Sequence, residues 1–427
     1  MQKKAIQSAR FASASVYPAD PWLKLEQDSE QTRQWTQQQN RRTSQWFDRH
    51  AASLFAQCGV SRPDDSYSCV SEIEDSFIAR KLYGDETCAV VRLDPDFHET
   101  EVLVDSTLVP GFIYNVIPSP ADSSILAIYT QNPQQGKPEF LLVDTRKQTV
   151  LQRFARCFSG VWSQQGDQFF FAQLVPHDQG GQLSHIQVWH LLSGKRTLLY
   201  QETDSAVYSF VRTGGDALFV QTYLTYTQVK LTRISLSTGQ IHLMNPGSFH
   251  NVNFIGTDQG LDYFTTDDQA SRGRIIACPT GQDFRKANEV VPQQDRILQS
   301  ACLVQGQLVC FYLNDGVCEL CLIDPRHNRS CPIPLPDPCG TITLLSEIPL
   351  NIRSGSPFLF FQFQSFQFPP CILRLSVTAR KVEPLQKTAS HASFCVEKVA
   401  IAARDTTRLL AFLAYDPQQG PVESMPA

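Results

Sequence analysis

Long apolar runs and clusters of basic residues are both missing from this 427-residue sequence. No run approaches the roughly 20 apolar residues that a membrane helix needs. The segment 1–10 begins basic but reaches no apolar stretch of the kind found in secretory signals. Net charge is −5 and the Lys and Arg residues are scattered, which argues against electrostatic binding to nucleic acid or to an anionic membrane. We therefore expect no membrane partner, no nucleic-acid partner and no secretory leader.

The cysteines give little support to a disulfide framework. There are 13, an odd number, and most lie inside apolar stretches typical of strands, such as Leu308–Tyr312. Without a secretory signal, reduced thiols that act as small hydrophobic residues are the simplest interpretation. We expect a cytoplasmic protein.

The first structured stretch has the pattern of a helix. Asp28–Thr32 has the composition of a helix N-terminus, with acidic residues in the first turn. One apolar face follows, and Gly59 and Pro63 mark the exit. The residues of this face are Trp35, Trp46, Phe47, Leu54 and Phe55.

From Glu72 onward, short alternating or apolar runs are separated by Gly, Asp, Asn and Pro, a pattern typical of strands and turns. The pattern repeats in seven units, each with a motif similar to Leu-x-Val-x-Asp before a polar turn. Stacked sandwiches are the alternative, but a sandwich normally stops at about 7–9 strands. Repeats of about 40–50 residues with four strands each predict an all-β, seven-bladed β-propeller. The units are Glu72–Asp105, Ile117–Arg153, Val161–Gln201, Val207–Asn245, Val252–Pro292, Leu298–Leu335 and Thr343–Gln386.

The turns before the closing strand of a unit show the repeat best. They are Thr145–Gln148, Leu192–Lys195, Ser237–Gln240 and, in the sixth unit, Asp324–Asn328. After the last unit, 394–401 and 408–415 predict two strands joined by the turn 403–406. We expect the Pro- and Gln-rich tail 416–427 to be disordered.

These features together resemble the prolyl oligopeptidase family, serine peptidases that cleave short peptides after proline. The matches follow the family's order along almost the whole chain. They are Asp20–Glu26, Asp28–Thr32, Trp35, Gln39–Asn40, Gly160–Ser163, Gly166–Phe171, Arg272–Ala277, Phe363–Phe366, Pro369–Pro370 and the hairpin 394–415. Lys24 stands where the family has a second aromatic residue, and one residue is missing before Asp28.

The resemblance implies three parts. Residues 1–70 would be the helical N-terminal segment, 71–386 the propeller, and 387–427 the truncated start of an α/β-hydrolase domain. The hairpin would be the part of that domain that remains. In this family the propeller is a lid over the active site that limits substrates to small peptides. Trp35, Trp46 and Phe47 would face the missing hydrolase domain, so we expect an exposed apolar patch there.

The chemistry of that domain is missing from the sequence. A nucleophilic serine in this fold needs the tight G-x-S-x-G turn. Only Ser61 has a glycine two positions before it, and Pro63 takes the place of the second glycine. His391 and Asp405 lie before any position where such a serine turn could follow. In this fold the Asp and His of the catalytic triad come after the serine. We therefore predict no catalytic residues and no activity for this chain alone.

Other constellations are weaker. Cys318, Cys321, His327 and Cys331 have a spacing close to that of a zinc knuckle. Residues three apart on a strand point to opposite faces, however, so we expect buried thiols and a turn histidine. The phenylalanines of 358–368 could line a peptide channel, but core packing is the expected role. Paired carboxylates for glycosidase chemistry cannot be identified, because the acids fall mostly in turns. We predict no metal and no cofactor.

Three functional hypotheses remain open. The first is one part of a truncated or split peptidase, whose propeller acts as lid and substrate filter for a separate hydrolase domain. The hairpin favours it, because an isolated two-stranded hairpin is marginally stable and its open edges invite a partner. The second is a free-standing propeller that binds a peptide or protein. The third is a propeller enzyme with a site in the central channel, marked by convergent carboxylates or a metal cluster.

Overall fold

The computed structural model describes residues 25, 29–58, 65–131, 136–177, 180–204, 206–247, 250–343, 356–385 and 395–415, with the side chains of the helix described as far as Arg49. The chain forms two compact units, Met1–Asp64 and Asp65–Ala427. Among the described residues, no helix is both long and apolar enough to cross a membrane. The predictions for Ser61, His391 and the tail 416–427 lie outside the described residues.

The first unit contains the predicted helix, α1 (Glu30–Cys58). Ser29 begins it, because its Oγ accepts a hydrogen bond from the backbone N–H of Thr32 at 3.1 Å. The aromatic side chains predicted to be exposed are exposed, with fractions of 37% for Trp35, 49% for Trp46 and 48% for Phe47. Trp46 and Phe47 contact each other edge to face, with ring centroids 5.2 Å apart. The described part of α1 therefore carries aromatic surface in contact with solvent.

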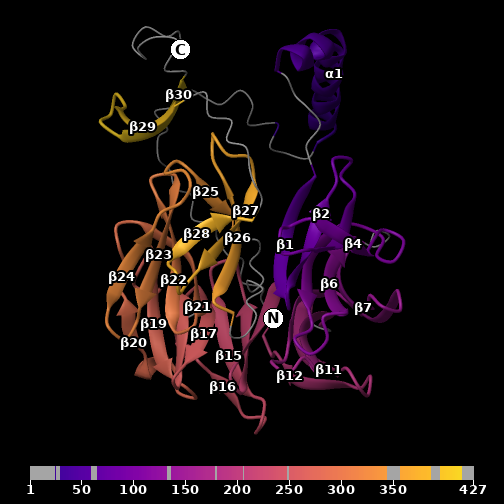
Figure 1. The fold of residues 1–427 in the computed structure, drawn as a ribbon, viewed down its shortest axis with the longest axis vertical. Coiled ribbons are helices and arrows are strands. Elements are labelled where there is room, and N and C mark those ends of the chain that lie inside the picture. Colours follow the sequence, from indigo (N-terminus) through magenta and orange to yellow (C-terminus); the bar gives the residue numbers. More distant parts are fainter. Residues whose placement is uncertain are drawn as a thin grey trace, which may run out of the picture. The chain divides into compact units, whose positions relative to one another are not determined.

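The second unit is a seven-bladed β-propeller (Figure 1). Within the described residues, each blade is a four-stranded antiparallel sheet made from four consecutive strands. The prediction of seven units is confirmed. The alternative of stacked sandwiches is wrong, because in the described residues each sheet contains only consecutive strands and has no Greek-key connection of the kind found in sandwiches.

The strands of the first four blades run from Ser66 to Leu243. They are, in blade 1, β1 (Ser66–Ile73), β2 (Ser76–Leu82), β3 (Cys88–Leu93) and β4 (Glu99–Val104); in blade 2, β5 (Ile113–Pro118), β6 (Ile125–Gln131), β7 (Pro138–Asp144) and β8 (Thr149–Ala155); in blade 3, β9 (Cys157–Trp162), β10 (Gln168–Pro176), β11 (Gln182–His190) and β12 (Arg196–Gln201); and in blade 4, β13 (Tyr208–Gly214), β14 (Ala217–Tyr223), β15 (Val229–Ser235) and β16 (Ile241–Leu243).

The last three blades follow the same plan, with one short helix in blade 5. Their elements are, in blade 5, β17 (Val252–Asp258), β18 (Leu261–Thr266), β19 (Arg274–Pro279), η2 (Phe284–Lys286) and β20 (Asn288–Val291); in blade 6, β21 (Ile297–Val304), β22 (Gln307–Asn314), β23 (Val317–Asp324) and β24 (Arg329–Ile333); and in blade 7, β25 (Thr341–Thr343), β26 (Phe358–Gln364), β27 (Cys371–Ser376) and β28 (Lys381–Pro384).

The turn between the third and fourth strands is held by the polar residue that ends the third strand. Asp144 Oδ1 accepts hydrogen bonds from the backbone N–H groups of Arg146 and Lys147, at 3.1 and 3.0 Å. Asp324 and Ser235 have the same role in blades 6 and 4. This is the reason for the Asp of the repeated motif, since Asp and Ser side chains can bond to the backbone two or three residues on. Each of the four predicted turns contains a residue in the left-handed region at or next to its last position, namely Gln148, Gly194, Gly239 and Asn328.

The core of the propeller is divided among the gaps between neighbouring blades. Seven hydrophobic clusters occupy these gaps, one for each pair of adjacent blades around the ring. The strands therefore present apolar residues on both faces. This explains why many strand sequences are continuous apolar runs instead of alternating apolar and polar residues.

The seam between blades 7 and 1 is closed by side chains. No strand from one end of the described propeller enters the sheet at the other end. Instead, Phe77 of blade 1 and Phe360 of blade 7 contact each other in one cluster, with ring centroids 5.7 Å apart. Ser356 Oγ donates a hydrogen bond to Glu72 Oε2 across the same seam, at 2.9 Å. Packing of this cluster is what joins the first blade to the last.

We expect Phe360→Ala to lower the free energy of unfolding by about 3–5 kcal/mol, because it removes a buried ring from the seam and leaves a cavity. Urea denaturation followed by circular dichroism measures the change. Leu192→Ala is the control, since Leu192 is 96% exposed and its loss should change stability by less than about 0.5 kcal/mol. Equal stability of the two variants would show that the seam does not hold the ring closed.

Candidate functional site

The predicted C-terminal hairpin is present as β29 (Cys395–Ala402) and β30 (Arg408–Tyr415). The two strands pair antiparallel in continuous register, from Cys395 opposite Tyr415 to Ala402 opposite Arg408. Asp405, which the sequence excludes as a triad member, lies in the connecting turn, where its Oδ1 accepts a hydrogen bond from the backbone N–H of Thr407 at 3.0 Å. The position of Asp405 is thus explained by the turn.

One face of the hairpin packs on the turns of blades 6 and 7. Phe412 contacts Phe366 with ring centroids 5.7 Å apart. Lys398 and Arg408 form ion pairs with Asp315, at 3.6 and 3.4 Å. Gly316 lies so close that a Cβ there would be 3.3 Å from Leu410 and 3.4 Å from Phe412. Its φ of 78° is also a conformation that favours glycine, so both turn geometry and hairpin contact require a small residue.

The opposite face of the hairpin is mainly apolar and partly exposed, with Glu397 as the one charged residue of its strands on this side. We call it the outer hairpin face, formed by Val399, Ile401, Leu409, Ala411 and Leu413, which are cross-strand neighbours or alternate along one strand. Ile401 and Leu409 are each 50% exposed and Leu413 is 38% exposed. Among the described residues, no third strand pairs with either edge of the hairpin. An apolar sheet face with open edges is a surface suited to a partner.

The sequence predicts no catalytic residues, and Ser61, His391 and Asp405 are set aside there. Asp405 belongs to the hairpin turn, and Ser61 and His391 lie outside the described residues. The third hypothesis required convergent carboxylates or a metal cluster. In the ranges that the structure describes, no three His, Cys, Asp or Glu side chains are grouped so that they could hold a metal ion.

The four residues with zinc-like spacing lie apart. Cys318 belongs to the cluster between blades 6 and 7, whereas Cys321 belongs to the cluster between blades 5 and 6. The expectation that they point to opposite faces of a strand is confirmed. Burial raises the pKa of the Cys318 thiol. His327 Nδ1 lies 2.8 Å from Asp324 Oδ2, and its hydrogen bond lowers the pKa of Asp324 to about 2. The raised pKa keeps Cys318 as a neutral thiol, which opposes metal ligation by this residue.

The phenylalanine-rich run of blade 7 is mainly core, as expected. Phe361 and Phe363 are fully buried between blades 6 and 7, and Phe360 lies at the seam. Phe366 is different, because it is 53% exposed and contacts Phe412 of the hairpin. This one ring is therefore part of the contact that positions the hairpin.

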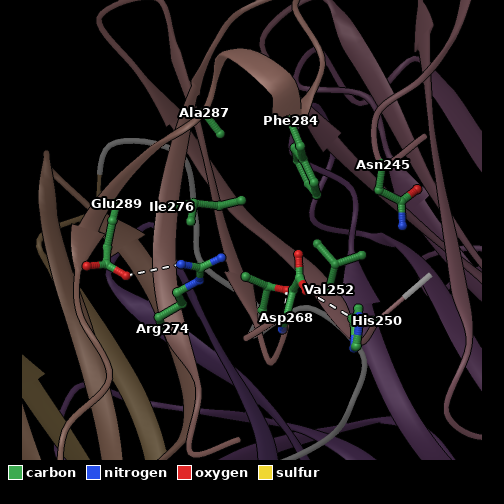
Figure 2. A pocket seen from close by; sticks show the side chains of 10 residues that line it. Asn245, His250, Val252, Asp268, Arg274, Ile276, Phe284, Ala287 and Glu289 are labelled. Carbon is green, nitrogen blue, oxygen red and sulfur yellow. Dashed lines mark hydrogen bonds and ion pairs between the residues drawn. The ribbon is translucent and has the colours of Figure 1, made fainter. Parts of the chain in front are cut away.

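A small pocket between blades 4 and 5 was not predicted from the sequence (Figure 2). Its volume is about 130 Å³. Val252, Thr266 and Arg274 are direct cross-strand neighbours on β17, β18 and β19, so their side chains share the face that lines it. Phe284 of η2 and Ala287 close another side. The connection between β19 and β20 forms this wall because it is longer than the corresponding turns of the other blades. It folds back toward blade 4, where the backbone N–H of Phe284 donates a hydrogen bond to the carbonyl oxygen of Met244 at 2.8 Å.

The polar groups of the pocket come in two ion pairs. Arg274 Nη1 lies 3.2 Å from Glu289 Oε2, and His250 Nε2 lies 3.4 Å from Asp268 Oδ1. Both pairs appear in Figure 2 as dashed lines. The only signal that sequence reasoning could have used is the length of the 280–287 connection, because residues from Asn245 to Glu289 meet here only after blades 4 and 5 have packed.

The sequence matches the prolyl oligopeptidase N-terminal β-propeller domain family over residues 15–388. A search of curated proteins gave no match. Similar solved structures include a prolyl endopeptidase, with 16% identity, a TM-score of 0.73, and coverage of 93% of this chain and 61% of that chain.

Two further solved structures have the same architecture. Prolyl oligopeptidase B from Galerina marginata, bound to a 35mer hydrolysis and macrocyclization substrate, has 15% identity, a TM-score of 0.73, and coverage of 93% and 62%. Oligopeptidase B from Leishmania major has 13% identity, a TM-score of 0.68, and coverage of 93% and 60%. At these identities the likeness shows the fold, and the chain spans about three fifths of the length of each of these structures.

We expect Phe412→Ala to release the hairpin from the propeller without unfolding the blades, because it removes the ring that packs on Phe366 and Gly316. Amide hydrogen exchange in 395–415 should become faster, while exchange in β22 and β26 should keep its rate. Leu413→Ala is the matched control on the outer hairpin face and should leave exchange unchanged. Equally fast exchange in both variants would contradict the conclusion that Phe412 holds the hairpin on the propeller while Leu413 faces away from it.

Proposed function

Because the chain belongs to the prolyl oligopeptidase family, we propose that it is the non-catalytic propeller part of a serine-type peptidase that hydrolyses short proline-containing peptides. The propeller acts as lid and substrate filter, and the nucleophile, base and oxyanion donors belong to a hydrolase domain that this sequence does not contain. The observation that carries the proposal is the outer hairpin face, an apolar surface with open strand edges next to the propeller.

The hairpin supports a role in joining the two parts. Its inner face is fixed by Phe412 and by the ion pairs of Lys398 and Arg408 with Asp315. Its outer face is therefore presented in a defined direction, with Ile401, Leu409 and Leu413 in contact with solvent. A sheet of a hydrolase domain could continue from either edge through backbone hydrogen bonds and cover these side chains. A two-stranded hairpin, which is marginally stable alone, gains stability when further strands pair with it.

The inter-blade packing supports the role of filter. A cover discriminates by size only if it resists deformation by a large substrate. The seven gaps between blades are filled by buried clusters, including the seam between blades 7 and 1. Close-packed interiors are stiff, so a ring built in this way admits a short unfolded peptide more readily than a folded chain.

We also infer a cytoplasmic location. All cysteines in the described residues are free thiols, and most are buried. Persisting thiols are typical of a reducing compartment. The hydrolase domain would work in the same compartment.

The docking role predicts a physical association with a reactive serine hydrolase. Native material captured with an antibody to the propeller should be labelled by a fluorophosphonate probe, and the label should map outside residues 1–427. The purified chain alone should take no label. Covalent labelling at a serine of this chain would overturn the proposal, and capture of a peptide without any labelled hydrolase would favour the free-standing propeller instead.

Substitution of the outer hairpin face should break this association. We expect Leu409→Asp combined with Leu413→Asp to remove the labelled hydrolase from the captured material, because each substitution places a charge in an apolar interface. Leu192→Asp, at a 96% exposed position of blade 3, is the matched control and should keep the label. If the double variant retains the label at the level of the control, the hairpin is not the joining surface.

The filter role predicts selection by size. In labelled preparations, kcat/KM for a short proline-containing peptide should exceed that for the same sequence held within a folded protein by at least about tenfold. Phe360→Ala, which weakens the seam, should narrow this difference. Equal rates on both substrates with the intact ring would exclude the filter, while leaving the docking role to be judged by the labelling experiment.

A further inference from the structure

The pocket between blades 4 and 5 contains a buried hydrogen-bond donor without an acceptor. Arg274 Nε is buried, and no protein atom in the described part of the chain accepts a hydrogen bond from it. The neighbouring Nη1 is paired with Glu289 at 3.2 Å. In Figure 2 the guanidinium lies between Glu289 and the space in front of Ile276. Nε itself has almost no exposed surface, but the Arg274 side chain as a whole is 24% exposed, so the guanidinium can donate to an oxygen atom of a ligand through its Nη groups.

The walls beside the guanidinium are apolar. Val252 and Ile276 are buried, with exposed fractions of 1% and 7%, and Phe284 and Ala287 complete this side. The volume of about 130 Å³ is far below the roughly 300–1,000 Å³ of pockets for drug-sized ligands. The space therefore suits one small group rather than a nucleotide, a sugar chain or a cofactor.

The other end of the pocket offers an acceptor. The carboxylate of Asp268 lies 3.4 Å from His250 Nε2 and lines the same space. Asp268 can accept a hydrogen bond from an N–H group of a ligand. Glu289 and Asp268 also make the surroundings unfavourable for a phosphate dianion, because like charges repel at short range. A ligand with one carboxylate and one nitrogen group meets less of this repulsion than a phosphate dianion, because it carries a smaller negative charge and its N–H group can face Asp268.

We propose that this pocket binds the α-carboxylate end of a small apolar amino-acid residue. The carboxylate accepts hydrogen bonds from Arg274, the side chain packs against Ile276 and Phe284, and the α-nitrogen donates to Asp268. A free amino acid and the C-terminal residue of a short peptide share this chemistry. The proposal is independent of the proposed peptidase role, because it depends only on residues of blades 4 and 5.

Calorimetric titration of the purified chain tests the carboxylate requirement. The probes are L-valine, acetyl-glycyl-L-valine and the C-terminal amide of each. We expect the acids to bind and their amides to bind at least about tenfold more weakly, because the amide loses the charge-assisted hydrogen bonds to the guanidinium. Binding of valine alone would identify a free amino acid as the source, and binding of the dipeptide acid would identify a peptide C-terminus.

Variants locate the binding in this pocket. Arg274→Gln should abolish it, and Arg274→Lys should weaken it although the charge is kept, because lysine lacks the planar fork of donors. Glu289→Gln is the matched control and should bind at least as tightly as the unchanged chain, since it removes a carboxylate that competes for the same guanidinium. Thermal unfolding of each variant checks the fold, and Asp268→Asn provides a second test should Arg274→Gln unfold.

Three results would overturn the inference. Equal affinity for acids and amides would show that no carboxylate is recognised. Unchanged binding in Arg274→Gln or Arg274→Lys would place the ligand elsewhere. Absence of heat with every probe at millimolar concentration, or tighter binding of inorganic phosphate than of valine, would exclude an amino-acid site.

Discussion

Packing between adjacent blades is the interaction on which the rest of this structure depends. Each four-stranded sheet carries apolar residues on both faces, and these become buried only when the faces meet the sheets on both sides. The cluster between blades 6 and 7 shows the scale, with a core that includes Phe311, Phe361 and Phe363. The seam between blades 7 and 1 is the most demanding gap, because its residues are far apart in the sequence and no shared strand holds them. The ring exists because Phe77 and Phe360 meet there.

The same packing determines where other features can form. In a sheet of consecutive antiparallel strands, the connections between the second and third strands and those between blades lie at one end of the ring. The turn at Asp315 and Gly316, on which the hairpin packs, and the polar end of the pocket at Asp268 and Arg274 both lie at this end. The opposite end is formed by the turns capped by Asp144, Ser235 and Asp324 and, in blade 5, by the longer 280–287 connection. The hairpin contact thus lies at the first end, whereas Phe284 and Ala287 of the pocket wall come from a connection of the second.

The repeat, the blade number and the hairpin could be predicted because they depend on local patterns. Apolar strands separated by Asp- or Gly-containing turns appear in the sequence in the order in which they fold. The start of blade 1 was placed at Glu72 rather than Ser66, because β1 contains a bulge at Cys69, where φ is 52° and the register shifts. A bulge adds one residue and breaks the alternation that sequence reading uses. The zinc-like spacing could be set aside from the sequence, since strand geometry sends Cys318 and Cys321 into different clusters.

The pocket and the seam could not be predicted, because both depend on which surfaces meet after the blades have formed. Nothing local distinguishes Arg274, which pairs with Glu289, from Arg153, which pairs with Glu139 across neighbouring strands of blade 2. What differs is the long 280–287 connection, which places Phe284 over β19 and leaves Arg274 Nε beside a small cavity. The Arg–Glu pair of blade 2 is therefore structural, whereas the similar pair of blade 5 becomes a candidate recognition group because a neighbouring loop folds over it. Functional differences between blades of one repeat therefore arise first in their connections, because substitutions in the strands would disturb the packing that holds the ring together.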